Sequence, residues 1–248
     1  MCIRDSLKER AETGRIYLMN IDHCNSHSSF KDSIYMSNLC QEITLPTDPI
    51  QHIDGEGEIA LCILSAVNVG KITNLDQLEE LCDLSVRALE ELIDYQEYPV
   101  RAAEIATKGR RSLGIGFIGL AHYLAKNGVK YNDQEAYDLV HKLSESFQYY
   151  LLKSSNQIAK EKGACDYFKA TKYADGILPI DTYKTDVDEI SSPEYNCDWE
   201  TLRESILEHG IRHSTLSSQM PSESSSVVSN ATNGIEPPRG YLSIKKSK

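Results

Sequence analysis

The chain has 248 residues, of which 40% are hydrophobic and 25% are charged, and its formal net charge is −11. These values are typical of a globular protein with enough material for a buried core. The negative charge argues against a nucleic-acid-binding surface, which needs clustered Lys and Arg, and the short basic cluster Lys245, Lys246 and Lys248 does not change this. No apolar run approaches the ~20 residues of a membrane span.

The cysteines indicate the redox compartment. There are seven, spread from Cys2 to Cys197, and we find no signal peptide ahead of them. An odd, dispersed set is typical of a reducing compartment, so we expect free thiols and a cytoplasmic protein.

The first elements in chain order are short. Residues 1–6 share no periodicity with the segment after them, so we interpret them as a leader foreign to the domain, a scar of translation or cloning, and place one domain over residues 7–248. Strands are expected over residues 15–19 and 38–45, with a polar turn at 25–29 between them, and a further apolar run covers residues 59–69.

Longer elements come next in the chain. We expect Asn74 to cap a helix that ends near Tyr95, because Pro99 cannot extend it. The pattern then predicts a strand over 113–118 and helices over 120–125, 134–162 and 199–209, the last two ending at Gly163 and Gly210. Strands that alternate with helices of this length predict an α/β fold with a largely parallel sheet.

The stretch S-N-L-C-Q-E-I at residues 37–43 holds candidate catalytic residues. Successive side chains of an extended chain point to opposite faces, so Asn38, Cys40 and Glu42 would share one side. One interpretation is an ordinary half-buried strand with an exposed cysteine. The other is a catalytic face, where a base and a hydrogen-bonding amide flank a sulfur.

Two patterns suggest other functions. G-I-G-F-I-G at residues 114–119 has the spacing of a dinucleotide-binding loop, but Asp133, the nearest acidic residue about 20 positions on, stands at the start of a helix and not at a strand end. The alternatives are a nucleotide-cofactor oxidoreductase or simple packing of helix on sheet. His23, Cys24 and His27 suit zinc chemically, but a structural site needs four ligands, so a zinc-stabilised interaction module competes with local hydrogen bonding in a turn.

The segment P-S-E-S-S-S at residues 221–226 also has two interpretations. It is either a serine-rich loop or the start of a helix capped by Ser222. In the second case the unpaired backbone N–H groups would bind an anion, and the hydroxyls of Ser224 and Ser225 would add donors for a phosphate.

Taken in order, the motifs of residues 7–248 resemble those of the large, catalytic subunit of class I ribonucleotide reductase. No single motif is as specific as the combination. The motifs are N-I-D-H-C-N at 20–25, S-N-L-C-Q-E-I at 37–43, G-E-I-A-L-C at 57–62, R-R-S-L-G-I-G at 110–116, K-E-K-G-A-C at 160–165, G-I-L-P-I-D-T-Y at 176–183, M-P-S-E-S-S-S at 220–226 and S-N-A-T-N-G-I-E-P-P-R-G-Y at 229–241.

The resemblance implies a fold and an activity. The fold is a ten-stranded α/β barrel of two five-stranded halves with the reactive cysteine on an inner loop, and this chain would be an internal fragment that holds roughly the later half. The activity is reduction of ribonucleoside diphosphates to 2′-deoxyribonucleoside diphosphates by a thiyl radical, and we expect the fragment alone to be inactive. The glycine motif and the His-Cys-His cluster then become structural.

The resemblance also implies roles for single residues. Cys40 would carry the transient thiyl radical and take the 3′ hydrogen, Glu42 would accept the proton of the 3′ hydroxyl, and Asn38 would hydrogen-bond the sugar. Cys62 would be one of two cysteines oxidised to a disulfide, with its partner upstream of this chain. Substrate contacts are expected from Asn38, Leu39, Cys40, Gln41 and Glu42, and diphosphate contacts from Pro221, Ser222, Glu223, Ser224 and Ser225.

The expected partners come from the same resemblance. We expect no metal and no cofactor on this chain, because the radical would come from a small, metal-containing beta subunit. ATP and deoxynucleotide effectors would bind segments absent here, and thioredoxin or glutaredoxin would act through a missing tail. The full-length subunit is expected to be a homodimer.

Overall fold

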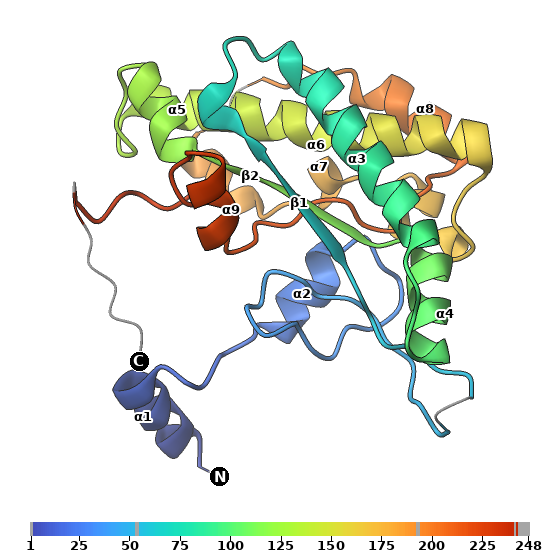
Figure 1. Cartoon of the computed structure of the whole chain (residues 1–248). Helices are drawn as coiled ribbons and strands as arrows, with labels where there is room; N and C mark the ends of the chain where they lie inside the picture. Colours follow the sequence, from blue (N-terminus) through green and yellow to red (C-terminus); the bar gives the residue numbers. More distant parts are fainter. Residues whose placement is uncertain (1, 53–54, 192–193, 241, 243–248) are drawn as a thin grey trace.

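The computed structural model describes residues 2–52, 55–191, 194–240 and 242, so the basic cluster Lys245, Lys246 and Lys248 lies outside it. None of the helices in this part of the chain is both long and apolar enough to cross a membrane. The elements in chain order (Figure 1) are α1 (Ile3–Thr13), α2 (Ile21–His27), β1 (Ile63–Asn68), η1 (Val69–Lys71), α3 (Gln77–Tyr95), α4 (Arg101–Arg110), β2 (Leu113–Ile118), α5 (Leu120–Lys126), α6 (Gln134–Lys162), η2 (Phe168–Ala170), η3 (Lys172–Asp175), α7 (Pro179–Thr182), η4 (Thr185–Glu189), α8 (Trp199–His209) and α9 (Glu223–Val228).

The centre of the fold is a parallel strand pair, β1 with β2, as the sequence predicts (Figure 1). The connection between the strands contains α3 and α4, which is the usual way to join parallel neighbours. A third chain segment, residues 215–218, runs along the other edge of β2. There the amide of Ile115 donates to the carbonyl of Leu216 at 2.8 Å, and Ile115 forms a parallel bridge with Ser217.

The two faces of this sheet have different neighbours. Val67 and Phe117 lie opposite each other in the register and belong to the hydrophobic core built with α3 and α6. The Phe117 ring packs edge-to-face on Phe147 of α6, with centroids 5.4 Å apart. Side chains alternate along a strand, so Gly114 and Gly116 share the other face. That face has no side chains on β2 at these positions and allows other chain segments to approach closely.

The long helices match the predicted bounds because their apolar residues recur every three or four positions. Helix α6 buries Leu143, Phe147, Leu151 and Ile158 against the sheet and α3. It ends at Gly163, whose φ of +91° is accessible to glycine. The ends of α3 and α8 and the whole of β2 also agree with the sequence prediction.

Several local predictions were wrong. The described structure has no strand over residues 15–19, and the expected turn at 25–29 is largely the helix α2. Helix α3 begins at Gln77 with Asp76 as N-cap, because Asn74 instead accepts the Asp76 amide in a local turn at 3.2 Å. Helix α1 buries none of its residues and runs through the boundary expected between residues 6 and 7, which stays a prediction.

Helix α4 was not predicted from the sequence, although it positions much of the site. Most of its buried residues are small, including Ala102, Ala103 and Ala106, and they give only a weak apolar signal. The helix ends at Arg111, a non-glycine residue with φ of +48°. This left-handed backbone costs energy for an arginine and is held by the contacts of its side chain.

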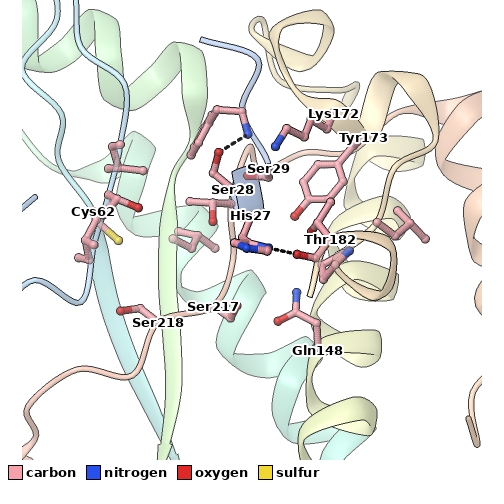
Figure 2. A pocket seen from close by; sticks show the side chains of 18 of the residues that line it. His27, Ser28, Ser29, Cys62, Gln148, Lys172, Tyr173, Thr182, Ser217 and Ser218 are labelled. Carbon is pink, nitrogen blue, oxygen red and sulfur yellow. Dashed lines mark hydrogen bonds between the residues drawn. The ribbon is translucent and has the colours of Figure 1, made fainter. Parts of the chain in front are cut away.

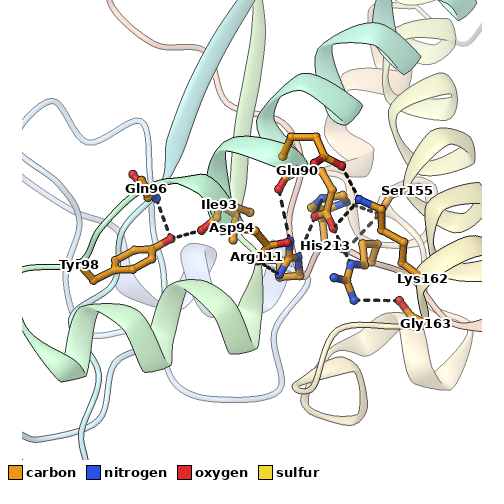
Figure 3. A network of polar contacts seen from close by, with 12 residues as sticks. Glu90, Ile93, Asp94, Gln96, Tyr98, Arg111, Ser155, Lys162, Gly163 and His213 are labelled. Carbon is orange, nitrogen blue, oxygen red and sulfur yellow. Dashed lines mark hydrogen bonds and ion pairs between the residues drawn. The ribbon is translucent and has the colours of Figure 1, made fainter.

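Those contacts belong to a buried polar network around Glu90 of α3 (Figure 3). The Glu90 carboxylate accepts from Arg111 Nε at 2.8 Å, from Arg212 Nε at 2.8 Å and from His213 Nε2 at 3.0 Å. On its other side, His213 Nδ1 pairs with the Ser155 hydroxyl of α6 at 2.8 Å. The network therefore joins α3, α6, the start of β2 and the segment that leads to residues 215–218.

The same network determines the protonation of its members. Burial opposes ionisation of Glu90, but the hydrogen bonds from His213, Arg111 and Arg212 outweigh it and hold the pKa of Glu90 well below its ordinary value. Burial also lowers the pKa of His213, although Glu90 acts in the opposite direction. A neutral His213 with its proton on Nε2 satisfies both of its contacts.

Candidate active site

The residues that carry Cys40 form a tight turn and not the extended strand that the sequence predicted. Asn38 closes the turn. Its backbone N–H donates to the Ile43 carbonyl at 3.1 Å, and its side-chain Oδ1 accepts the backbone N–H of Ile43 at 3.1 Å. Gln41 lies in the turn with φ of +64°. The side-chain alternation assumed for Asn38, Cys40 and Glu42 is therefore lost, because a side-chain-to-backbone hydrogen bond competes with the extended conformation.

The residues of the turn differ in how exposed they are to solvent. Asn38 and Cys40 are exposed at its tip, whereas Glu42 is partly buried. The Ser218 hydroxyl donates to the Glu42 backbone carbonyl at 3.0 Å and so fastens the turn to the segment beside β2. The Oε2 atom of Glu42 is buried, and no donor among the described residues reaches it. A carboxylate oxygen in this state is available to accept a proton from a ligand.

Cys62 lies just before β1, on the same face of the sheet as Gly114. Burial, together with the negative charge of Glu42, raises the pKa of the Cys62 thiol to about 12. The thiol is therefore protonated at neutral pH. All seven cysteines lie in the described residues and are free.

Within the described residues, Cys62 lines two cavities. The first has a volume of about 220 Å³, and both Cys62 and Glu42 line it. Figure 2 shows Cys62 with Lys172, Thr182 and Ser217, which line the same cavity. The second, of about 580 Å³, is lined by Cys62, Asn38 and apolar side chains of the segment before β1. The structure thus brings Cys62 close to Glu42 and to Asn38, while the exposed Cys40 lines neither cavity.

The glycines of β2 make this arrangement possible. A Cβ on Gly114 would lie 2.9 Å from the Cys62 sulfur and 3.1 Å from Cβ of Ser218. A Cβ on Gly116 would lie only 2.2 Å from the backbone oxygen of Ser218. The sequence did not single out Ser218, which precedes the M-P-S-E-S-S-S motif and has no distinguishing pattern.

We expect Gly116→Ala to reduce the free energy of unfolding by about 1–3 kcal/mol, because the colliding atom belongs to the backbone and cannot rotate away. Gly240→Ala is the matched control, since Gly240 is exposed and a Cβ there meets nothing closer than 3.8 Å. Urea unfolding followed by circular dichroism measures both changes. Equal stability of Gly116→Ala and the unsubstituted chain would contradict the close approach.

The cofactor interpretation of residues 114–119 is not supported by the structure. A phosphate would need the free N–H groups at the start of α5. There the amide of Gly119 already donates to the Thr232 carbonyl at 2.9 Å, and that of Leu120 reaches the Gly234 carbonyl at 3.4 Å. The segment after α9 therefore covers the position that a dinucleotide would occupy.

The zinc interpretation also lacks support. In the described part of the chain, no three His, Cys, Asp or Glu side chains come together in a group that could hold a metal ion. His23 and His27 lie on α2 with ring centroids 6.0 Å apart, and Nδ1 of His27 contacts the carbonyl of Thr182. Local hydrogen bonding is what the structure shows.

The serine segment has the expected helix start, with Ser222 as N-cap of α9. Ser222 occupies the N-cap position, but its side chain does not bond to the amides of the first turn. The buried Ser222 hydroxyl instead donates to Oδ1 of Asn233 at 3.1 Å and accepts the Gly234 amide at 3.2 Å. Ser225 donates to the Ser222 carbonyl at 3.2 Å, and both Ser224 and Ser225 are exposed. Residues 221–225 line neither cavity at Cys62, but only residues 219 and 220 separate them from Ser218 in the chain.

A partly buried thiol and a carboxylate with one unpartnered oxygen thus line one cavity beside the parallel strands of an α/β fold. Residues 3–248 match the family model described as "Ribonucleotide reductase, barrel domain", and the chain belongs to this family. Membership supports an α/β barrel-type fold, of which the described strand pair is a part.

Similar curated proteins agree with this assignment. The chain is 61% identical over 246 residues to the ribonucleoside-diphosphate reductase subunit alpha of Haemophilus influenzae, and 61% identical over 246 residues to the ribonucleoside-diphosphate reductase 1 subunit alpha of Escherichia coli. It is 48% identical over 247 residues to the subunit alpha of Enterobacteria phage T4. Each match covers 98% of this chain but 32% of the relative, so the chain spans about a third of the length of the curated relatives it matches.

Proposed function

We propose that this chain is the active-site part of a catalytic subunit that reduces ribonucleoside diphosphates to 2′-deoxyribonucleoside diphosphates. In the complete subunit it would form roughly the later half of a ten-stranded α/β barrel, with Cys40 on an inner loop. The observation that carries the proposal is the family match over residues 3–248, combined with the approach of Glu42 and Cys62 to one cavity.

The proposed roles divide the chemistry among four residues. Cys40 forms a transient thiyl radical that takes the 3′ hydrogen of the ribose, and Glu42 accepts the proton of the 3′ hydroxyl. The unpartnered Oε2 of Glu42 supports this role, because a base needs a free lone pair within reach of the proton. Asn38 supports the turn through its Oδ1, which leaves the Nδ2 group to donate to the sugar.

Cys62 supplies reducing equivalents together with a second cysteine from another part of the complete subunit. Two thiols deliver two electrons and two protons and become a disulfide, which requires Cα atoms ~4.4–6.8 Å apart. The raised pKa of Cys62 supports a role as a thiol that stays protonated until it reacts.

The proposed substrate contacts come from the two segments that flank this site. Residues 38–42 contact the nucleoside, and residues 221–225 at the start of α9 bind the diphosphate. The direct chain connection from Ser218 to Pro221 supports their proximity. We further propose a metal-containing beta subunit as radical source, thioredoxin or glutaredoxin as reductant, a homodimeric full-length subunit and a cytoplasmic location.

The proposal is tested with the full-length subunit that contains this chain, assayed with its beta subunit, a reduced dithiol and each ribonucleoside diphosphate. We expect deoxynucleotide product, measured by chromatography. The 248-residue chain alone is expected to form none, because the second redox cysteine and the radical source lie elsewhere. Failure of the full-length assembly to form product, or turnover by the isolated chain, would contradict the proposal.

A further inference from the structure

We propose that Arg110 is a positioning residue that aligns the chain segments carrying the reactive groups. It lies at the end of α4 and is 5% exposed by its side chain. Its guanidinium contacts two carboxylates, each of which stands a few residues before a proposed catalytic residue. The expected effect of Arg110 on turnover rests on the proposed function. The expected effect on the alignment of the chain segments rests on the geometry alone.

The first carboxylate is Glu58, four residues before Cys62. Arg110 donates from Nε and Nη2 to the two oxygens of Glu58, each at 2.8 Å, and the Glu58 side chain is 2% exposed. A bidentate pair of this kind fixes orientation as well as distance, because the guanidinium and the carboxylate must be coplanar. It therefore fixes the direction in which the chain enters β1.

The second carboxylate is Asp32, six residues before Asn38. Arg110 Nη1 donates to Asp32 Oδ2 at 2.9 Å, and the Asp32 side chain remains 41% exposed. This contact holds the start of the segment that leads into the Cys40 turn. One guanidinium thus ties together the approach to Cys40 and the approach to Cys62.

The backbone of Arg110 holds a third segment. Its carbonyl accepts the amide of Ser214 at 3.0 Å, and Ser214 begins the run along β2 that reaches Ser218 and then Pro221. All three segments that carry the proposed thiol, base and diphosphate contacts are therefore attached at one residue. The contacts with Glu58 and Asp32 depend on its side chain, so a substitution can remove them while leaving the Ser214 contact.

The guanidinium is itself held on its face by Tyr167. The carbon Cζ of Arg110 lies 4.3 Å from the centroid of the Tyr167 ring. A Cβ on the preceding Gly109 would lie 2.5 Å from that ring, so only glycine allows the tyrosine to stack there. The side chain is enclosed by two carboxylates and an aromatic face, which leaves it one orientation.

The structural test uses hydrogen exchange followed by mass spectrometry on the 248-residue chain. Arg110→Met removes the guanidinium that binds Glu58 and Asp32. Arg101→Met is the matched control at the exposed start of the same helix, where Arg101 pairs with Glu104. We expect Arg110→Met to accelerate exchange over residues 32–43 and 58–62 by about tenfold or more, with α6 unchanged, because the opening is local. Arg101→Met is expected to have no effect.

Asp32→Asn provides a second variant that keeps the buried Glu58 pair and so preserves folding if Arg110→Met does not. We expect faster exchange over residues 32–43, by about threefold, with residues 58–62 at the unsubstituted rate. Unchanged exchange of both segments in the variants would overturn the proposal. Equal acceleration of α6 would also overturn it, since it would indicate general destabilisation.

The catalytic test uses the full-length subunit with its beta subunit. Turnover per bound nucleotide is expected to fall about 100-fold in Arg110→Met, because misplacement of reacting groups by about 1 Å has this effect. The dissociation constant for the diphosphate should change by less than about twofold. Arg110→Lys keeps the positive charge but not the paired hydrogen bonds to Glu58, so it should restore only part of the turnover. An equal loss of binding and turnover would contradict positioning. Absence of turnover in the unsubstituted enzyme would refute the proposed function instead, and the exchange experiment would still decide the role of Arg110.

Discussion

Replacement of Cys40 by serine in the full-length subunit is expected to lower turnover by on the order of a thousandfold or more, because a hydroxyl does not form the radical that a thiol forms. The substitution should leave folding and diphosphate binding intact. Cys40 is exposed at the tip of its turn, and the hydrogen bonds that hold the turn come from Asn38 and Ser218. Product formation measured by chromatography and diphosphate affinity measured by calorimetry separate the two effects.

Cys197→Ser is the matched control for this experiment. Cys197 is also a free thiol, but it lies just before α8 and lines neither cavity at Cys62. We expect normal turnover from this variant. Deoxynucleotide production by Cys40→Ser at the unsubstituted rate would refute the role assigned to Cys40 and with it the proposed reaction.

Substitution of Glu90 by alanine is expected to lower the free energy of unfolding by about 3–5 kcal/mol, the usual effect of removing one partner from a buried ion pair. The Glu90 side chain is 1% exposed, and its loss would remove the carboxylate that accepts from Arg111 Nε and His213 Nε2, although Arg111 would keep its contacts with Asp94. Urea unfolding of the 248-residue chain measures the change.

The neighbouring Glu91 supplies the control. It is the same residue type on the same helix, but its side chain is 72% exposed and pairs with Lys162 at the surface. Exposed pairs contribute about 0–1 kcal/mol, so Glu91→Ala should stay close to the unsubstituted chain. Similar losses in the two variants would show that the network is not the source of the stability.

The dependence of stability on pH gives a second measure of the same network. The pKa of Glu90 is lower in the folded chain than in the unfolded one, so the unfolded chain binds more protons in acid and stability is lost as the pH falls below about 4.5. The lowered pKa of His213 acts in the same direction below about 6.5. Glu90→Ala should therefore show a shallower acid dependence, and an unchanged slope would argue against ionised Glu90.

The regular elements were largely predictable from the sequence. In α6 the apolar spacing and the terminal glycine define the same residues that the structure shows, because burial of one helical face and the positive φ at Gly163 are local properties. Helix α4 was missed because half of its buried residues are alanines, whose contribution depends on what packs against them. The residues 15–19 have strand-like composition but no neighbouring strand with which to pair in the described structure.

The sequence by itself determined which residues are chemically available: its ordered motifs identified the family, the thiols and the carboxylate, since these depend on residue type and order alone. The tertiary structure decided their arrangement. The turn at Cys40 comes from the hydrogen bond between Asn38 and Ile43, which competes with the extended conformation. The approach of Glu42 to Cys62 and the attachment of three segments to Arg110 depend on partners far away in the chain, such as Ser218 for Glu42 and Asp32 for Arg110. Spacing along one strand could not reveal them, because a hydrogen bond between distant residues leaves no periodic trace in either segment.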